Sequence, residues 1–182
     1  MSAIRLEPLY QTILNKGTYD LIERMGPIYG RYNTWLGPGY YFWEGAIELA
    51  HWWGLVHCKS NYIICEATAE FEQSEMFDLF GNTADFKLFR DITDALKEKF
   101  AFKEITVSAV LNEMRKRTSF PYKVIRARSE HIIPGGKRLK FVESDPNVLV
   151  TLPAVQVCFS DVRSVKNYHV IYPQPINGQE LV

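Results

Sequence analysis

Cysteine, net charge and long apolar runs are all scarce in this sequence, and each shortage argues against a class of protein. The 182 residues contain three cysteines, Cys58, Cys65 and Cys158, which lie far apart and form no CxxC pair. Neither a disulfide framework nor a zinc knuckle is indicated, and a reducing compartment is favoured. Lysine plus arginine and aspartate plus glutamate both number 21, so a broadly basic surface for nucleic acid is not indicated.

Hydrophobic runs of membrane-spanning length are also missing. No stretch approaches about 18 uncharged apolar residues, and the first residues, MSAIRLEPLYQ, lack the apolar core of a signal peptide. We therefore expect a soluble protein of the cytoplasm that has no membrane partner.

Several common catalytic and cofactor signatures are absent. Gly37-Pro38-Gly39 supplies GxG, but the third glycine of a dinucleotide fingerprint is missing and the proline removes an amide N–H, so Rossmann-type binding is disfavoured. The four histidines form no i, i+4 pair, and we expect no metal site. No GxSxG stands between a strand and a helix, which argues against a serine hydrolase.

Hydrophobic residues make up 47% of the sequence and aromatic residues 14%. These are enough to form the hydrophobic core of one domain over residues 1–182. Residue periodicity predicts strands and helices in an order that favours an α+β fold over an alternating parallel sheet. Pro8 suggests that the first strand is an edge strand. The predicted strands are 5–11, 40–43, 61–72, 122–127, 139–142, 155–160 and 168–172, and the predicted helices are a short one ending at Met25, then 44–55, 85–100 and 106–117.

The most unusual segment is WLGPGYYFW at positions 35–43, followed by a predicted helix that carries Trp52 and Trp53. Glycines at positions 37 and 39 allow the backbone to approach a ligand closely, and the aromatic rings offer flat faces for a planar heterocycle. The same composition also fits a corner of the hydrophobic core, and composition alone leaves both interpretations open.

Within this segment, Gly37-x-Gly39-x-Tyr41-Phe42, followed by a helix containing Ala50, resembles the second motif of ADP-ribosyltransferases of the diphtheria toxin and poly(ADP-ribose) polymerase type. In that family the tyrosine stacks on nicotinamide and an aromatic residue on the next helix closes the other face. Tyr41 and Trp52 stand at the matching offsets.

Two further segments are similar to the other motifs of this family, in the same order along the chain. The sequence from Leu9 to Thr12 is similar to the first motif, with Gln11 in place of its histidine. The sequence VQVCFSD at 155–161, followed by 168–172, is similar to the third motif, with Gln156 where the catalytic glutamate would stand. The middle of the chain also looks like small bacterial members found in toxin and phage-defence settings.

The resemblance implies a split, strongly bent β-sheet with surrounding helices and NAD bound as substrate in the cleft. Gln156, Tyr41 and Gln11 would be the catalytic positions, with Gln11 orienting the ribose. Gln11, Thr12, Gly39, Tyr41 and Trp52 would contact NAD, Thr12 through its backbone. Gln156 can accept a hydrogen bond from a ribose hydroxyl but carries no charge, so it would stabilise an oxocarbenium ion less well than a carboxylate.

Charged residues elsewhere leave further roles open. Glu44 or Glu130 could supply a carboxylate, and Arg5 or Arg31 could meet the pyrophosphate, although ordinary surface positions explain these two arginines better. The polar stretch 126–150 corresponds to a loop that helps the family choose its acceptor. The charged residues of this stretch either contact a macromolecule or are exposed to solvent without a function. They are Arg126, Arg128, Glu130, Lys137, Arg138 and Lys140.

The sequence leaves three hypotheses for the function open. The first is an NAD-dependent ADP-ribosyltransferase acting on an unidentified protein or nucleic-acid acceptor, as a toxin or defence protein with an antitoxin or a second copy as a further partner. The second is a catalytically inactive relative that binds NAD or another nucleotide in the same cleft. The third is an interaction domain whose aromatic residues are core.

Overall fold

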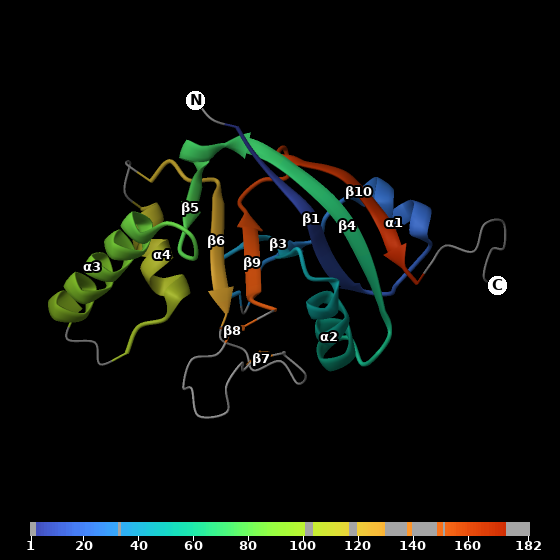
Figure 1. The fold of residues 1–182 in the computed structure, drawn as a ribbon, viewed down its shortest axis with the longest axis horizontal. Coiled ribbons are helices and arrows are strands. Elements are labelled where there is room, and N and C mark those ends of the chain that lie inside the picture. Colours follow the sequence, from blue (N-terminus) through green and yellow to red (C-terminus); the bar gives the residue numbers. More distant parts are fainter. Residues whose placement is uncertain are drawn as a thin grey trace.

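The computed structural model describes residues 3–32, 34–100, 104–116, 120–129, 138–139, 149–150 and 152–173. The two longest strands, β1 (Ala3–Leu14) and β4 (Tyr62–Glu72), pair over most of their length. Both are rich in β-branched and aromatic residues, and apolar side chains such as Leu9, Ile63 and Ile64 are fully buried in them. This pair is one half of a sheet whose two halves are seen in Figure 1.

Shorter strands complete the main sheet on both sides of this pair. The remaining strands are β2 (Tyr29–Gly30), β3 (Gly39–Glu44), β5 (Met76–Asp78), β6 (Val124–Ser129), β9 (Ala154–Phe159) and β10 (Val165–Tyr172), and a separate pair is formed by β7 (Arg138–Leu139) and β8 (Leu149–Val150). The helices are α1 (Tyr19–Met25), α2 (Ile47–His57), α3 (Thr83–Phe100) and α4 (Val107–Arg115), with a 3-10 turn at Gln73–Glu75.

The main sheet has the strand order β10-β4-β1-β3-β9-β6-β5, with β2 paired to β3. All of its ladders are antiparallel except the one between β5 and β6. The mixture of helices with a largely antiparallel sheet confirms the predicted α+β class. The segment Met76–Asp78 was not predicted as a strand, because three residues give no readable periodicity.

The two halves of the sheet are joined by a short ladder. β1 pairs with β3 only at Leu9 with Glu44 and at Tyr10 with Trp43. Beyond Tyr10, β1 continues along β4 to Leu14, whereas β3 continues along β9 to Tyr40. The sheet therefore splits after Tyr10, as the resemblance implied.

The prediction that the first strand lies at an edge is wrong, because β1 lies between β4 and β3. Pro8 is tolerated in this internal strand since the β1–β4 register shifts between Leu6 and Leu9, so Pro8 stands where the ladder is already interrupted. The Pro8 carbonyl accepts a bond from the Gly45 amide at 2.9 Å, which ties β1 to the turn after β3.

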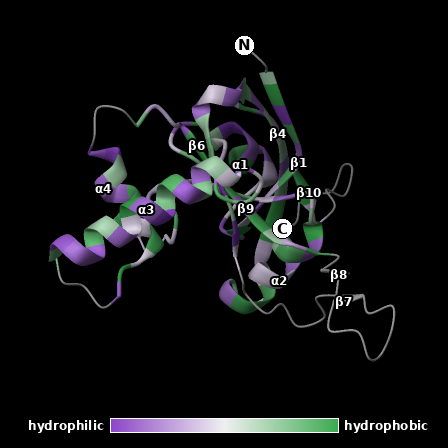
Figure 2. Cartoon of the chain, turned by 60° about the vertical axis from the view of Figure 1, so that its left-hand side comes forward, coloured by the Kyte–Doolittle hydropathy of each residue, from purple (hydrophilic) through white to green (hydrophobic). Residues whose placement is uncertain are grey.

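Side chains on the two faces of the sheet pack against different helices. Successive side chains of a strand point to opposite faces of the sheet. The face that carries Tyr10 and Trp43 is called the first face, and the face that carries Leu9 and Phe42 is called the second face. On the first face, α2 packs over Tyr10 and Trp43, and α3 and α4 cover the side chains of β5, β6 and β9. On the second face, α1 packs through Ile22 against Ile13. Figure 2 shows α3 and α4 alternating between hydrophilic and hydrophobic residues, as helices with one apolar side do.

Side-chain caps and a glycine mark the ends of three helices. The side chain of Asn82 accepts bonds from the amides of Ala84 and Asp85 at 2.9 and 3.4 Å and so caps α3. The Thr106 hydroxyl accepts a bond from the Ala109 amide and caps α4. Gly26 ends α1 in a left-handed conformation with φ of 72°.

The part of the chain that the structure describes contains no helix both long and apolar enough to cross a membrane. Of the predicted strand 139–142, only Leu139 falls within a described strand, and the other residues lie outside the described part of the chain.

Gly39 is the position where the close packing of β3 against β9 is most easily tested. A Cβ at this residue would meet the Cys158 sulfur and lie 2.7 Å from the Phe159 carbonyl oxygen. Gly39→Ala should therefore lower the free energy of unfolding by about 2 kcal/mol, measured by urea denaturation. Gly17→Ala is the matched control, because its nearest neighbour would be Leu21 at 3.9 Å, and it should change stability by less than about 0.5 kcal/mol. Equal stability of the two variants would contradict the close approach.

Candidate functional site

The three segments that resemble family motifs contain three neighbouring strands, β1, β3 and β9, at the centre of the sheet, whereas residues 168–172 of the third segment lie in the edge strand β10. Their registers align one continuous row of side chains across the first face. The row runs His169, Glu66, Tyr10, Trp43, Gln156 and Ala127. Residues far apart in the sequence are thus brought together by strand pairing alone.

Several of the predicted site residues gather on or around this first face. Tyr41 lies two residues before Trp43 on β3, and Thr12 two residues after Tyr10 on β1, so both side chains share the face of Gln156. The Thr12 hydroxyl donates to the Ala50 carbonyl at 2.7 Å, which holds β1 against α2. Trp52 lies on α2, the helix that covers this face.

Gln11 is the exception, since its side chain lies on the second face. The amide nitrogen donates to the carbonyls of Ile28 and Tyr41 at 3.1 and 3.2 Å. The amide oxygen accepts from the Ile28 amide at 2.7 Å and from the Tyr168 hydroxyl at 3.0 Å. Two donors and two lone pairs are then all in use, and the side chain is only 5% exposed. In this arrangement Gln11 bridges the point where β1 and β3 separate, and its direct contact with ribose stays a prediction.

Gln156 is buried on β9 and is held by a residue of the glycine-rich loop. The Trp35 indole nitrogen donates to the Gln156 side-chain oxygen at 2.5 Å. The two residues are 121 positions apart, and Gln156 is 7% exposed. The loop that precedes β3 therefore covers the predicted catalytic position.

Tyr41 is fixed by the same loop. Its hydroxyl accepts from the Leu36 amide at 2.9 Å and donates to the Gly37 carbonyl at 2.7 Å. Burial raises the pKa of Tyr41 far above its usual value, so the phenol stays protonated. Arg115 of α4 donates to the Leu36 carbonyl at 2.9 Å and so ties the loop to the helix layer. The Tyr41 ring is a fixed surface rather than a proton donor near neutral pH.

Trp52 and Tyr41 pack in separate hydrophobic clusters of the same face. Trp52 contacts Trp43 edge to face, with ring centroids 6.4 Å apart, and Trp53 at 6.1 Å. Trp43 thus stands beside Tyr41 on β3 and against Trp52 on α2. The two predicted stacking residues border one aromatic area, and a nicotinamide sandwiched between them stays a prediction.

Arg126 lies in strand β6, which agrees with the predicted strand 122–127 and not with the assignment of Arg126 to the polar loop 126–150. Its guanidinium donates to both Glu44 carboxylate oxygens, at 2.6 and 3.0 Å, and lies 3.1 Å from the Asp78 carboxylate. Burial opposes the positive charge of Arg126, but Glu44 and Asp78 outweigh it, so the pKa of Arg126 is raised. The guanidinium also lies 4.9 Å from the Phe80 ring centroid. Arg126 is therefore an internal ion-pair residue rather than an acceptor contact.

Glu44 is accordingly committed to Arg126 and lies on the second face, away from the Gln156 side chain. Arg5 pairs with Glu7 and stands opposite Glu70, so it lies on the first face but near the start of β1, five residues before Tyr10. Arg31 and Arg128 are exposed. Glu130, Lys137 and Lys140 lie outside the described residues, and nothing is described of the Arg138 side chain.

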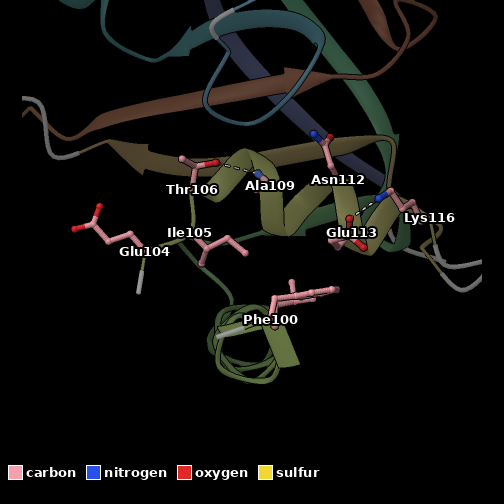
Figure 3. Close-up of a pocket in the computed structure, with 9 residues that line it drawn as sticks. Phe100, Glu104, Ile105, Thr106, Ala109, Asn112, Glu113 and Lys116 are labelled. Carbon is pink, nitrogen blue, oxygen red and sulfur yellow. Dashed lines mark hydrogen bonds and ion pairs between the residues drawn. The ribbon is translucent and has the colours of Figure 1, made fainter. Parts of the chain in front are cut away.

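A separate hollow of about 860 Å³ lies between α3 and α4 and is drawn in Figure 3. Its lining includes the apolar Leu96 and Ile105 and the acidic Glu104 and Glu113, and Lys116 is ion-paired with Glu113. Carboxylates at its rim would repel a pyrophosphate, and no predicted site residue lines it. This hollow does not fit a dinucleotide.

Comparison of the chain with protein-family models, with curated proteins and with solved structures found no match. The site must therefore be interpreted from its own residues. The sequence prediction missed the role of Trp35 and Arg115, both of which hold the loop before β3. No local pattern signals a contact between residues 35 and 156, since it arises only after β3 has paired with β9.

Removal of the Gln11 amide tests its bridging role. Gln11→Leu removes the bonds that the Gln11 side chain makes with the amide and carbonyl of Ile28, the Tyr41 carbonyl and the Tyr168 hydroxyl. We expect a loss of about 3 kcal/mol in the free energy of unfolding by urea denaturation. Gln73→Leu, at an exposed position, is the control and should be nearly neutral. A stable Gln11→Leu protein would show that the bridge contributes little.

Alkylation of the cysteines tests how tightly the loop covers β9. Burial raises the pKa of Cys158 to about 12 and that of Cys65 to about 11, whereas Cys58 is partly exposed. Iodoacetamide at pH 8 should modify Cys58 at least about tenfold faster than either buried thiol, because the thiolate is the reactive form. Peptide mapping by mass spectrometry identifies the site. Rapid modification of Cys158 in the folded protein would mean that the loop opens readily.

Proposed function

We propose that this chain is an NAD-dependent ADP-ribosyltransferase that transfers ADP-ribose to a protein or nucleic-acid acceptor. NAD is bound at the first face, where β1 and β3 separate. Tyr41 and Trp52 provide the aromatic surfaces for nicotinamide, Thr12 and Gly39 provide backbone close to it, and Gln156 meets the ribose. Gln11 supports the site by fixing the main chain at Ile28 and Tyr41.

One observation supports this proposal above the others. The three segments chosen for their likeness to family motifs contribute the adjacent strands β1, β3 and β9, and the sheet splits beside them. The second part of the third segment, 168–172, lies apart from them in the edge strand β10. Thr12, Tyr41 and Gln156 then share one face with the helix that carries Trp52. Gln11 of the first motif is the exception, because its side chain lies on the second face.

The proposed reaction requires little proton transfer by the protein. The bond between the ribose C1′ and the nicotinamide nitrogen breaks, and the electron pair leaves with nicotinamide. The oxocarbenium-like ribose is then attacked at C1′ by an acceptor oxygen, nitrogen or sulfur, which loses its proton to solvent or to a basic group of the acceptor. Stabilisation of the positive charge is the main task, and the uncharged Gln156 does this less well than a carboxylate. We expect slow turnover.

A second candidate is a relative that binds a nucleotide without transferring it. It is favoured by the use of both predicted catalytic amides in internal bonds, Gln11 to Ile28, Tyr41 and Tyr168, and Gln156 to Trp35. Amide groups that are already used in internal bonds suit a rigid binding surface better than a catalytic centre that must stabilise the positive charge developing on the ribose. Both candidates place the protein in the cytoplasm, where NAD and its acceptors are found, and both leave room for an antitoxin or a second copy as partner.

Incubation of the protein with NAD labelled on its adenosine moiety, in a cell lysate, tests the first candidate. Transfer should place label on protein or nucleic acid, and Tyr41→Ala should reduce labelling at least about tenfold by removing the stacking surface. Tyr29→Ala serves as the control, because Tyr29 is an exposed aromatic residue outside the proposed site. Gln156→Glu should raise the rate of labelling, since a carboxylate stabilises the developing positive charge.

The outcomes separate the two candidates. Saturable NAD binding, seen as a rise in melting temperature, without any label on an acceptor would favour the inactive relative. No thermal shift at millimolar NAD would contradict both. Unchanged NAD binding by Tyr41→Ala would contradict the placement of nicotinamide even if transfer occurred.

A further inference from the structure

We infer that Trp35 is a positioning residue that turns the Gln156 amide so that its nitrogen, and not its oxygen, faces a bound ligand. Gln156 would then donate a hydrogen bond to an acceptor oxygen of the ribose, whereas a glutamate at this position would accept one. This inference rests on the proposed function, because it takes the ligand of the first face to be NAD.

The first step is the chemistry of the two groups. An indole N–H can only donate, and a glutamine amide has an accepting end and a donating end. The Trp35 nitrogen lies 2.5 Å from the Gln156 oxygen, so the amide must turn its oxygen toward the indole. The reversed amide would place N–H groups against an N–H group. The two donors of the amide nitrogen are what the side chain can offer to a ligand.

The second step is that the main chain that carries Trp35 is held in place. The next residue, Leu36, is fully buried, its amide donates to the Tyr41 hydroxyl and its carbonyl accepts from Arg115. Gly37 follows with a positive φ of 87° and its carbonyl accepts from the Tyr41 hydroxyl. The indole is therefore attached to a segment held by β3 and by α4.

The third step concerns the neighbours of Gln156 on its own face. In the cross-strand row it stands between Trp43 and Ala127. The Ala127 side chain has no polar atom, and of the two indoles near Gln156, Trp35 is the one that donates to the amide oxygen in the described part of the chain. Within the residues that the structure describes, Trp35 makes the one hydrogen bond given for this side chain. In this described part of the chain, Trp35 therefore sets which end of the amide is available.

The test compares three ligands that differ at the 2′ position of the nicotinamide ribose. NAD carries a hydroxyl that both donates and accepts, a 2′-fluoro analogue in the ribo configuration can only accept, and the 2′-deoxy analogue does neither. Dissociation constants are measured by calorimetry, so the readout does not depend on turnover. If Gln156 donates, the natural protein should bind the fluoro analogue within about threefold of NAD and the deoxy analogue about tenfold more weakly.

Trp35→Phe removes the indole N–H and lets the amide turn. It should weaken NAD binding about fivefold and abolish the preference for the fluoro over the deoxy analogue, because the nitrogen is no longer held toward the ribose. Trp53→Phe is the matched control. Trp53 packs against Trp43 and His57 on α2, and its replacement should leave the order of the three ligands unchanged.

Equal binding of the fluoro and deoxy analogues by the natural protein would overturn the inference while leaving NAD binding intact. The same holds if Trp35→Phe keeps the natural order of the three ligands. If the folded natural protein, checked by its melting curve, binds none of the three, the proposed function itself fails and the inference with it.

Discussion

The two-residue ladder between β1 and β3 is the constraint on which the rest of the arrangement depends. It joins the halves of the sheet at Leu9 with Glu44 and Tyr10 with Trp43, and then lets the strands separate. At the point of separation the Gln11 amide takes over, with bonds to the main chain of Tyr41 on one side and Ile28 on the other. A side chain thus replaces the missing backbone ladder, because buried peptide groups left unpaired would cost several kcal/mol.

This constraint also explains how the aromatic segment is organised. With β3 anchored by β1 and β9, the loop before it folds back over the first face, where Tyr41 and Trp35 hold it by hydrogen bonds. α2 closes the same face through Trp52 and through the bond from Thr12 to Ala50. The opposite face is used for stability, through α1 and through the Arg126 ion pairs with Glu44 and Asp78.

Much of this fold could be predicted from the sequence, since β4, α3 and α4 show strong periodicity and the caps at Asn82 and Thr106 are local signals. The position of β1 could not, because Pro8 indicates an edge strand unless the register shift beside it is known. The internal bonds of Gln11, the ion pairs of Arg126 and the contact of Trp35 with Gln156 join residues at least 17 positions apart. Local sequence patterns carry no information about such contacts.

A crystal structure of the protein with NAD measures the central claim most directly, namely that the first face beside the split is the ligand site. The account predicts density for nicotinamide against Tyr41 and Trp52, with the Gln156 amide nitrogen within hydrogen-bond distance of the ribose and Trp35 still bonded to its oxygen. A dinucleotide found elsewhere, in the hollow between α3 and α4 or on the second face, would contradict it.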